Sequence, residues 1–177
     1  MCFYRILRAG RVTMAYQIIE YPVEKQAFYN LLKEQLILYT ENAIDPVSAL
    51  ANASAVLHAA FSGINWVGFY LVRGERLVLG PFQGKPAVME IGYGQGVCGG
   101  AWSAKKTQVV KDVHCFSGHI ACDLTSVSEI VVPVFGPDNA VLGVIDIDSP
   151  LPGRFDDEDA KGLHMAAEII ARYMGAA

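Results

Sequence analysis

The chain has 177 residues, of which 53% are hydrophobic and 18% charged, and its formal net charge is −4. This length suits one domain with a buried core, and the apolar content excludes a disordered chain. The 17 Gly and 8 Pro residues follow no period, which excludes collagen-like and repeat architectures. The mild acidity argues against a nucleic-acid partner, because such surfaces need clustered Lys and Arg. We therefore expect a compact soluble domain.

The N-terminal segment differs from the rest. We expect residues 1–18 to form an extension without stable structure and residues 19–175 to form the folded domain. The extension carries Arg5, Arg8 and Arg11 and no acid, a pattern that also fits an organelle-targeting peptide, although it lacks Ser. No secretory signal is recognised, so the four Cys residues are expected to be reduced thiols in the cytoplasm.

Helical spacing of apolar residues predicts a first helix opened by Pro22. Asp45-Pro46 predicts the second helix, with Asp as N-cap and Pro in the first position. This helix and the strand after it lie in residues 46–72, which contain no Asp, Glu, Lys or Arg. Asn and Ser residues interrupt that run and Ser62-Gly63 breaks it, so we expect no membrane span. Asp156 predicts the N-cap of the last helix.

Alternation with period two predicts a sheet between these helices. The expected strands are residues 66–72, 76–79, 88–91, 108–110, 129–135 and 140–147, with a short helix at about 99–106. Two helices, a mostly hairpin-linked sheet and a closing helix predict an α+β fold, a single domain with a central, mostly antiparallel sheet covered by helices.

Gly94-Gln95-Gly96-Val97-Cys98-Gly99 matches the G-x-G-x-x-G dinucleotide motif. A parallel crossover needs about 10–12 residues or more, and too few separate these glycines from the next strand. A flexible loop that lets Cys98 approach another group is the better interpretation.

Four metal-ligand types occur close together at His114, Cys115, His119 and Cys122. Structural zinc sites usually draw their ligands from two separated pairs, so this short segment is a weak candidate and no metal is expected.

Acids near the Cys residues form a third group. Asp146 and Asp148 are two residues apart on a predicted strand, so both carboxylates point to one face, and Glu129 begins the strand before it. On a covered face, desolvation would raise their pKa and let one donate a proton near neutral pH. The alternative is that they lie on the solvent face.

Several strings together carry a family resemblance. They are INWVGFY at 64–70, GPFQGK at 80–85, GQGVCG at 94–99, DVH at 112–114, GHIACD at 118–123, SEI at 128–130 and GVIDIDS at 143–149. In this combination the chain resembles the GAF-domain free methionine-(R)-sulfoxide reductases, from the first helix to the last.

The resemblance implies a GAF-like fold and thiol-dependent reduction of free L-methionine (R)-S-oxide. The Cys122 thiolate would attack the sulfoxide sulfur and become a sulfenic acid as methionine leaves. Cys98 would then form a disulfide with Cys122, which thioredoxin or another dithiol reopens. No bound cofactor is implied, and the family suggests a role in oxidative stress and a homodimer.

The resemblance also assigns substrate contacts. Trp66 and Tyr70 would wall the pocket for the methylthio group, although two aromatic residues on a strand are also typical of a core. Glu129 and Asp148 would bind and protonate the sulfoxide oxygen. Asp146 would hold the ammonium group, which would restrict the substrate to the free amino acid.

Two alternatives stay open at this stage. Val88 stands where family members often carry a third Cys, so the resolving thiol is either Cys98 or the additional Cys115. The alternative function is a non-catalytic GAF sensor that binds a small molecule.

Overall fold

The computed structural model describes residues 6–8, 11–13, 19–116, 118 and 123–175. Its helices are α1 (Lys25–Thr40), α2 (Pro46–Ala60), α3 (Gly96–Ala104) and α4 (Asp157–Met174), with a short 3-10 turn, η1 (Val113–Cys115). Its strands are β1 (Ile6–Arg8), β2 (Arg11–Thr13), β3 (Trp66–Arg73), β4 (Arg76–Gln83), β5 (Glu90–Gly92), β6 (Gln108–Val110), β7 (Ser128–Phe135) and β8 (Val141–Ser149).

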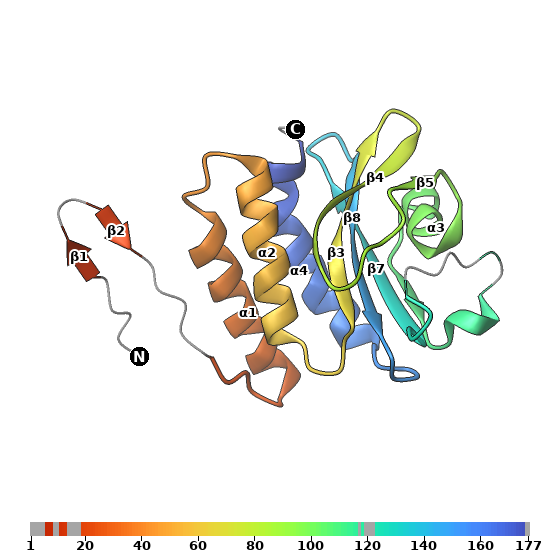
Figure 1. The fold of residues 1–177 in the computed structure, drawn as a ribbon, viewed down its shortest axis with the longest axis horizontal. Helices are drawn as coiled ribbons and strands as arrows, with labels where there is room; N and C mark the ends of the chain where they lie inside the picture. The colour runs from red at the N-terminus through yellow and green to blue at the C-terminus, as the bar shows by residue number, and fades with distance from the viewer. Residues whose placement is uncertain (1–5, 9–10, 14–18, 117, 119–122, 176–177) are drawn as a thin grey trace.

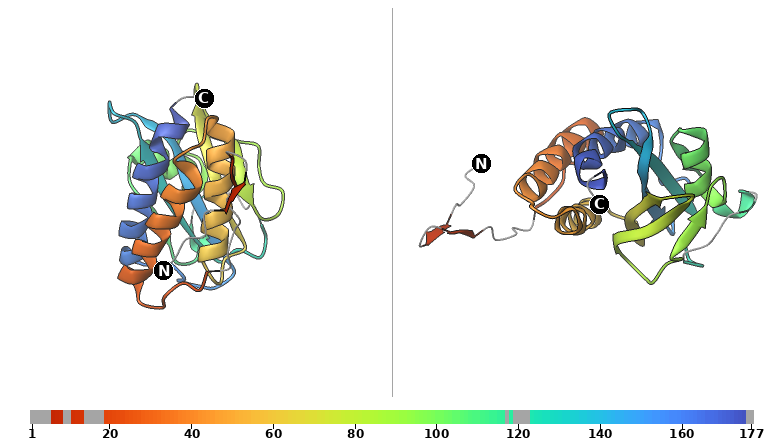
Figure 2. Two further views of the ribbon diagram at one scale, coloured as in Figure 1. Left: turned by 90° about the vertical axis from the view of Figure 1, so that its left-hand side faces the viewer. Right: turned by 90° about the horizontal axis from the view of Figure 1, so that it is seen from above.

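Six of the strands form one sheet in the order β5-β4-β3-β8-β7-β6, and every neighbouring pair in it is antiparallel. Helices α1, α2 and α4 cover one face of this sheet, and α3 lies on the other (Figures 1 and 2). The predicted α+β class is therefore confirmed. Strands β1 and β2, in the segment expected to lack stable structure, pair with each other in a separate small sheet.

Side-chain caps determine where the long helices begin. The prediction that Pro22 opens α1 was wrong, since α1 begins at Lys25 and the Glu24 carboxylate accepts hydrogen bonds from the next backbone N–H groups. The predicted N-caps Asp45 and Asp156 are both confirmed, and Asp156 forms a reciprocal capping box with Asp159. Among the described helices, none has both the length and the apolarity that a membrane crossing requires.

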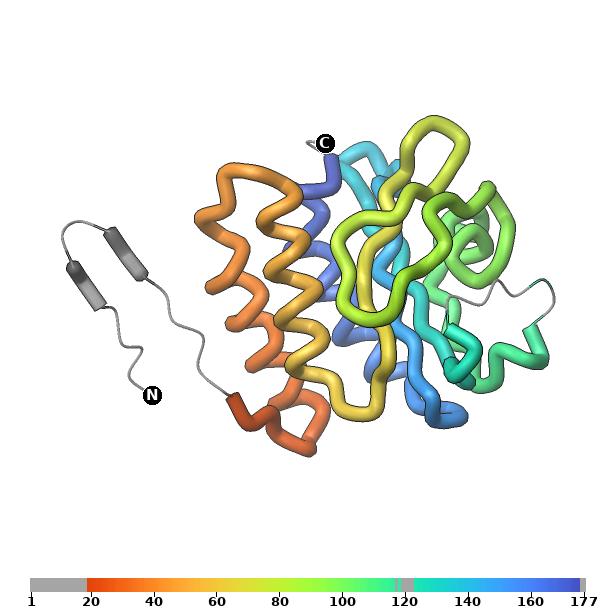
Figure 3. The backbone as a smooth tube through the Cα atoms, in the orientation of Figure 1, coloured from red at the N-terminus to blue at the C-terminus, as the bar shows by residue number. Residues whose placement is uncertain are grey.

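Three predicted boundaries shift. Strand β4 continues to Gln83, β5 begins at Glu90 rather than Val88, and α3 begins at Gly96 rather than about Gly99. The segment between β4 and β5 passes over β3 (Figure 3). Two hydrogen bonds hold it there, from Trp66 Nε1 to the Lys85 carbonyl at 3.1 Å and from the Tyr70 hydroxyl to the Val88 carbonyl at 2.9 Å.

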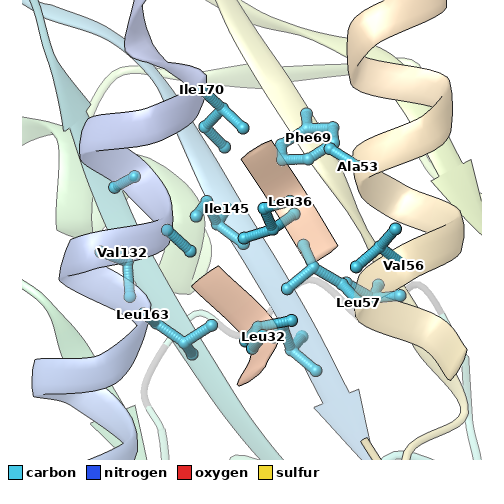
Figure 4. Packing of buried hydrophobic residues seen from close by; sticks show 14 of the residues in the cluster. Leu32, Leu36, Ala53, Val56, Leu57, Phe69, Val132, Ile145, Leu163 and Ile170 are labelled. Carbon is cyan, nitrogen blue, oxygen red and sulfur yellow. The ribbon is translucent and has the colours of Figure 1, made fainter. Parts of the chain in front are cut away.

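The main hydrophobic core lies between the sheet and the helices α1, α2 and α4. Leu36, Leu57 and Leu163 from these helices pack against Phe69 and Ile145 of the sheet, and all five are fully buried (Figure 4). Burial of such a side chain contributes about 1.5–3 kcal/mol. Apart from the buried pair Ser128 and Ser149, the central strands β7 and β8 present apolar side chains to this core.

Candidate active site

The face of the sheet that α3 covers carries three acids in its central strands. Because side chains alternate along a strand, Trp66, Asp148 and Glu129 form a row across β3, β8 and β7, where their Cα atoms are register partners. Asp146 lies on the same face two residues earlier, opposite Gly68 and Val131. The exposed fractions of Glu129, Asp146 and Asp148 are only 5%, 2% and 4%. The prediction of a shared, covered face is confirmed, and a solvent-facing position is excluded.

Helix α3 brings a thiol to these acids. The helix connects β5 at one edge of the sheet to β6 at the other, so it crosses the sheet face (Figure 1). Cys98 lies near its start and is 3% exposed, and its Sγ lies within 4.8 Å of a carboxylate oxygen of Asp146. The expectation that Cys98 occupies a flexible loop was therefore wrong, because the glycines around it build a helix.

The glycine motif has a structural explanation. Gly94 and Gly96 adopt positive φ angles of 75° and 59°, which L side chains rarely adopt, in the turn that enters α3. A Cβ atom at Gly99 would lie 2.4 Å from the carbonyl oxygen of Gly92, so only glycine allows this close approach of helix and strand. The sheet that follows is antiparallel and α3 is nine residues long, which excludes a dinucleotide-binding crossover.

Cys98 and the three acids enclose a small cavity between α3 and the sheet. We call it the acidic cavity; it is lined by Ile91, Gly96, Val97, Cys98, Glu129, Asp146 and Asp148. Its volume is about 10 Å³, roughly the space that one water molecule needs. No basic side chain is among these lining residues, so within the described chain the acids meet one another with no cation between them.

This crowding changes the acidity of all three groups. Burial raises the pKa of Glu129, Asp146 and Asp148 well above their ordinary values. Charge repulsion adds to the pKa rise, from Asp148 on Glu129, from Glu129 on Asp146, and from Asp146 on Asp148. One carboxylate oxygen of Glu129 and one of Asp146 lie within 4.8 Å of each other. A raised pKa favours the protonated form of a carboxyl group, which is the form that can donate a proton to a bound oxygen.

Trp66 and Tyr70 lie beside the acids on the same face but are not among the residues that line the cavity. Both are fully buried, their ring centroids are 6.1 Å apart, and Phe82 stacks on Trp66 at 5.4 Å. Their polar atoms bond to the backbone of the segment between β4 and β5. They therefore pack one end of the site against that segment.

The loop that precedes β7 is anchored by an ion pair that the sequence analysis missed. Lys85 Nζ lies 2.8 Å from Oδ2 of Asp123, and Oδ1 of the same carboxylate accepts hydrogen bonds from the backbone and hydroxyl groups of Thr125. These bonds hold the pKa of Asp123 well below its usual range, with Lys85 the largest cause. Lys85 and Asp123 are the last residues of the strings GPFQGK and GHIACD. Their opposite charges at the ends of two family motifs were the only sequence signal for this ion pair.

The remaining candidates fall into two groups. Cys122 and His119 lie outside the described residues, immediately before Asp123. His114 and Cys115 are described and exposed on η1, where the Cys115 thiol is 3.8 Å from the Asp112 carboxylate. Among the described residues, the only group of three Cys, His or acidic residues with converging ligand atoms is in the acidic cavity. The described part of 114–122 therefore adds no support to the weak metal candidate in that segment.

The fold and the position of this site define a GAF domain, and the family model described as "GAF domain" matches residues 47–174. The chain is 47% identical over 152 residues to free methionine-R-sulfoxide reductase of Escherichia coli, covering 86% of this chain and 92% of that one. It is 45% identical to the Saccharomyces cerevisiae enzyme of the same name, covering 77% and 82%.

Solved structures agree with this assignment. The free methionine-R-sulfoxide reductase of Neisseria meningitidis, in complex with its substrate, matches with a TM-score of 0.85 and 42% identity, covering 92% of this chain and 97% of that one. The reduced Staphylococcus aureus enzyme matches with a TM-score of 0.78 and 50% identity, covering 82% and 94%. The chain belongs to the free methionine-R-sulfoxide reductase family and is an enzyme of this kind.

Proposed function

We propose that this enzyme reduces free L-methionine (R)-S-oxide to L-methionine by thiol chemistry at the acidic cavity. The observation that carries the proposal is the convergence of Cys98 with three buried carboxyl groups, with no basic side chain among the described residues that line the cavity. A zwitterionic sulfoxide supplies what this arrangement lacks, an ammonium group for a carboxylate and an oxygen for an acid. The names of the relatives support the same substrate.

In the chemical step, the Cys122 thiolate attacks the sulfoxide sulfur. The S–O bond of the substrate breaks, one proton is taken up, and the products are methionine and the Cys122 sulfenic acid. Glu129 and Asp148 hold and protonate the sulfoxide oxygen. Their raised pKa supports this role, because a carboxyl that is still protonated at neutral pH can act as a general acid.

Substrate selection depends on Asp146. Its ionised carboxylate pairs with the substrate ammonium and so replaces the repulsion from Glu129 with an attraction. A methionine sulfoxide residue within a peptide has no free ammonium and would leave the buried carboxylate unpaired. The enzyme therefore acts on the free amino acid. Trp66 and Tyr70 form the apolar wall for the methylthio group.

Recycling requires a second thiol. The Cys98 thiol condenses with the Cys122 sulfenic acid, which releases water and leaves a disulfide, and thioredoxin or another dithiol then reduces that disulfide. Cys98 is preferred because it lies in the cavity itself, whereas Cys115 is exposed on η1. The reaction uses no bound metal or cofactor.

We also propose that the enzyme works as a cytoplasmic homodimer. Reduced thiols suit a cytoplasmic location. Leu31 and Leu38, seven residues apart on α1, are half-buried in a single chain and give a partner an apolar contact. Light scattering tests the dimer, and a monomer that retains full activity would reject it.

The function is tested with reduced protein, racemic free methionine sulfoxide and a dithiol, followed by chromatographic separation of the isomers. We expect loss of the R isomer alone, and loss of neither isomer would reject the proposal. Cys122→Ser abolishes turnover, because a hydroxyl is a far poorer nucleophile at neutral pH. Cys98→Ser forms about one methionine per chain and then stops with thioredoxin. The same arrest in Cys115→Ser, with Cys98→Ser turning over normally, would instead assign the resolving role to Cys115.

A further inference from the structure

The acidic cavity presents the donor atoms of a metal site. Cys98 Sγ, one oxygen of Glu129 and one oxygen of Asp146 all lie within 4.8 Å of one another, and all three residues are buried. A thiolate with carboxylate oxygens is a donor set that Zn²⁺ binds. Alkaline-earth cations take oxygen ligands and do not use the sulfur.

A second observation points to a missing ligand. Asp146 Oδ1 is buried and has no hydrogen-bond partner among the described residues. A buried polar atom without a partner is unfavourable, because it has lost its hydration and nothing replaces it. A cation in the cavity would bind this oxygen directly, and Asp148 is close enough to line the same space.

Size and geometry also favour a single ion. The cavity holds about 10 Å³, which admits a water-sized species and excludes an organic molecule without rearrangement. Zn–S bonds of about 2.3 Å and Zn–O bonds of about 2.0–2.2 Å place tetrahedral donors roughly 3.4–3.6 Å apart. Movements of about 1 Å from the present separations produce that geometry. The sulfur comes from α3 and the oxygens from β7 and β8, so the ion would clamp the helix to the sheet.

We propose that the acidic cavity binds one Zn²⁺ through Cys98, Glu129 and Asp146, and that bound Zn²⁺ excludes the sulfoxide substrate. The exclusion rests on the proposed function, which assigns Asp146 to the ammonium and Cys98 to recycling. Zinc is therefore a reversible inhibitor of a reaction that itself needs no metal. It occupies the resolving thiol and the ammonium site together.

The binding test uses the full chain, freed of metal and reduced with a phosphine that contains no thiol. Titration with zinc chloride in a calorimeter is expected to show one ion per chain and a raised melting temperature. Cys98→Ser and Asp146→Asn are each expected to weaken binding by about tenfold or more. Cys115→Ser is the matched control, since it removes an exposed thiol that also lies near a carboxylate, and it should bind zinc as the wild type does.

Cobalt gives a test that needs no variant. Co²⁺ in the wild-type cavity should show sulfur-to-cobalt charge-transfer absorption, and its absence would overturn the proposal. The assignment would also be overturned if Cys122→Ser or Cys115→Ser lost the ion while Cys98→Ser kept it.

The competition arm separates this inference from the proposed function. The competition uses Cys122→Ser protein, which keeps the three proposed zinc ligands and does not turn over. Methionine sulfoxide should lower its apparent zinc affinity, and an unchanged affinity at saturating sulfoxide would overturn the exclusion. Because ion binding is measured without turnover, zinc binding by a protein that reduces no sulfoxide would reject the function and leave the ion site standing. Turnover of the sulfoxide by a protein that binds no zinc would reject the ion site and leave the proposed function standing.

Discussion

Two groups of buried carboxyls lie on opposite faces of the same sheet, and their surroundings differ. On the face covered by α1, α2 and α4, Asp159 accepts a hydrogen bond from the Tyr29 hydroxyl at 2.8 Å and pairs with Lys25 Nζ at 2.8 Å. It also accepts from the backbone N–H of Asp156 in the capping box. In the acidic cavity, three carboxyls share a space with a thiol, and no basic side chain is among the described residues that line it.

The difference separates structural acids from functional ones. The Asp159 carboxylate has hydrogen-bond and charge partners within the chain. It therefore joins α1 to α4 and contributes to stability. The cavity acids raise the energy of the unliganded protein, because desolvation and mutual repulsion oppose their ionisation. A cationic ligand recovers that energy when it binds. The exposed fraction does not distinguish Asp159 from the cavity acids. The presence of hydrogen-bond and charge partners does.

The largest expected effect is on the structural side of this comparison. Asp159→Ala removes the partner of Tyr29 and Lys25 and breaks the capping box, and we expect a loss of about 3 kcal/mol of unfolding free energy. This is at the lower end for a buried pair, since the Lys25 side chain is 29% exposed. Urea unfolding measures it. Tyr29→Phe is the control, with a loss of about 1 kcal/mol, and equal losses in the two variants would contradict the assignment.

Asp146→Asn should show the opposite profile. The amide keeps the shape and removes a charge that is repelled in the unliganded protein, so unfolding free energy at neutral pH is unchanged or raised. The KM for free methionine sulfoxide should rise by at least about tenfold, since loss of one partner of a buried charge pair costs on the order of 2–5 kcal/mol. Steady-state kinetics beside urea unfolding tests both halves. A destabilised variant with normal KM would make Asp146 a structural acid.

The pH dependence of stability should reveal both groups. The cavity acids have raised pKa values when folded, so the folded state binds more protons and unfolding free energy rises as pH falls toward the ordinary value near 4. The partners of Asp156 lower its pKa to about 2, so its contribution is lost as pH falls from about 4 to 2. Urea midpoints across pH should therefore peak at mildly acidic pH, with a flatter upper limb in Asp146→Asn. Stability that rises steadily to alkaline pH would contradict this.

The smallest effect is expected at the ion pair of Asp123, the residue that follows the proposed nucleophile in the sequence. Lys85→Met removes the cation that holds Asp123, directly after Cys122 in the chain. Because the Lys85 side chain is 65% exposed, the pair is worth on the order of 0–1 kcal/mol, and kcat/KM should fall by less than about tenfold with little change in stability. Lys33→Met, at an exposed position on α1, is the control. A fall of equal size in that variant would remove the positioning role of Lys85.

Much of the fold could be predicted because it depends on local patterns. The caps Asp45 and Asp156 and the alternation that places Asp146 and Asp148 on one face are encoded within a few residues. The place of Cys98 could not be predicted in this way. A glycine-rich sequence predicts a mobile loop. In the structure, the glycines instead allow α3 to approach β5 closely, as the contact of Gly99 with the Gly92 carbonyl shows, and this packing cannot be recognised from the sequence pattern. The Lys85–Asp123 pair joins positions 38 residues apart, beyond the reach of periodicity.

The crossing of the sheet by α3 has a consequence for access. A cavity of about 10 Å³ admits no amino acid, so substrate binding requires α3 or the segment over β3 to shift. Strands β3, β8 and β7 pair with one another independently of α3, which lets the helix open as a local unit while the face covered by α1, α2 and α4 stays folded. Backbone amides of α3 should therefore exchange with solvent deuterium before those of β8, and bound substrate should slow them.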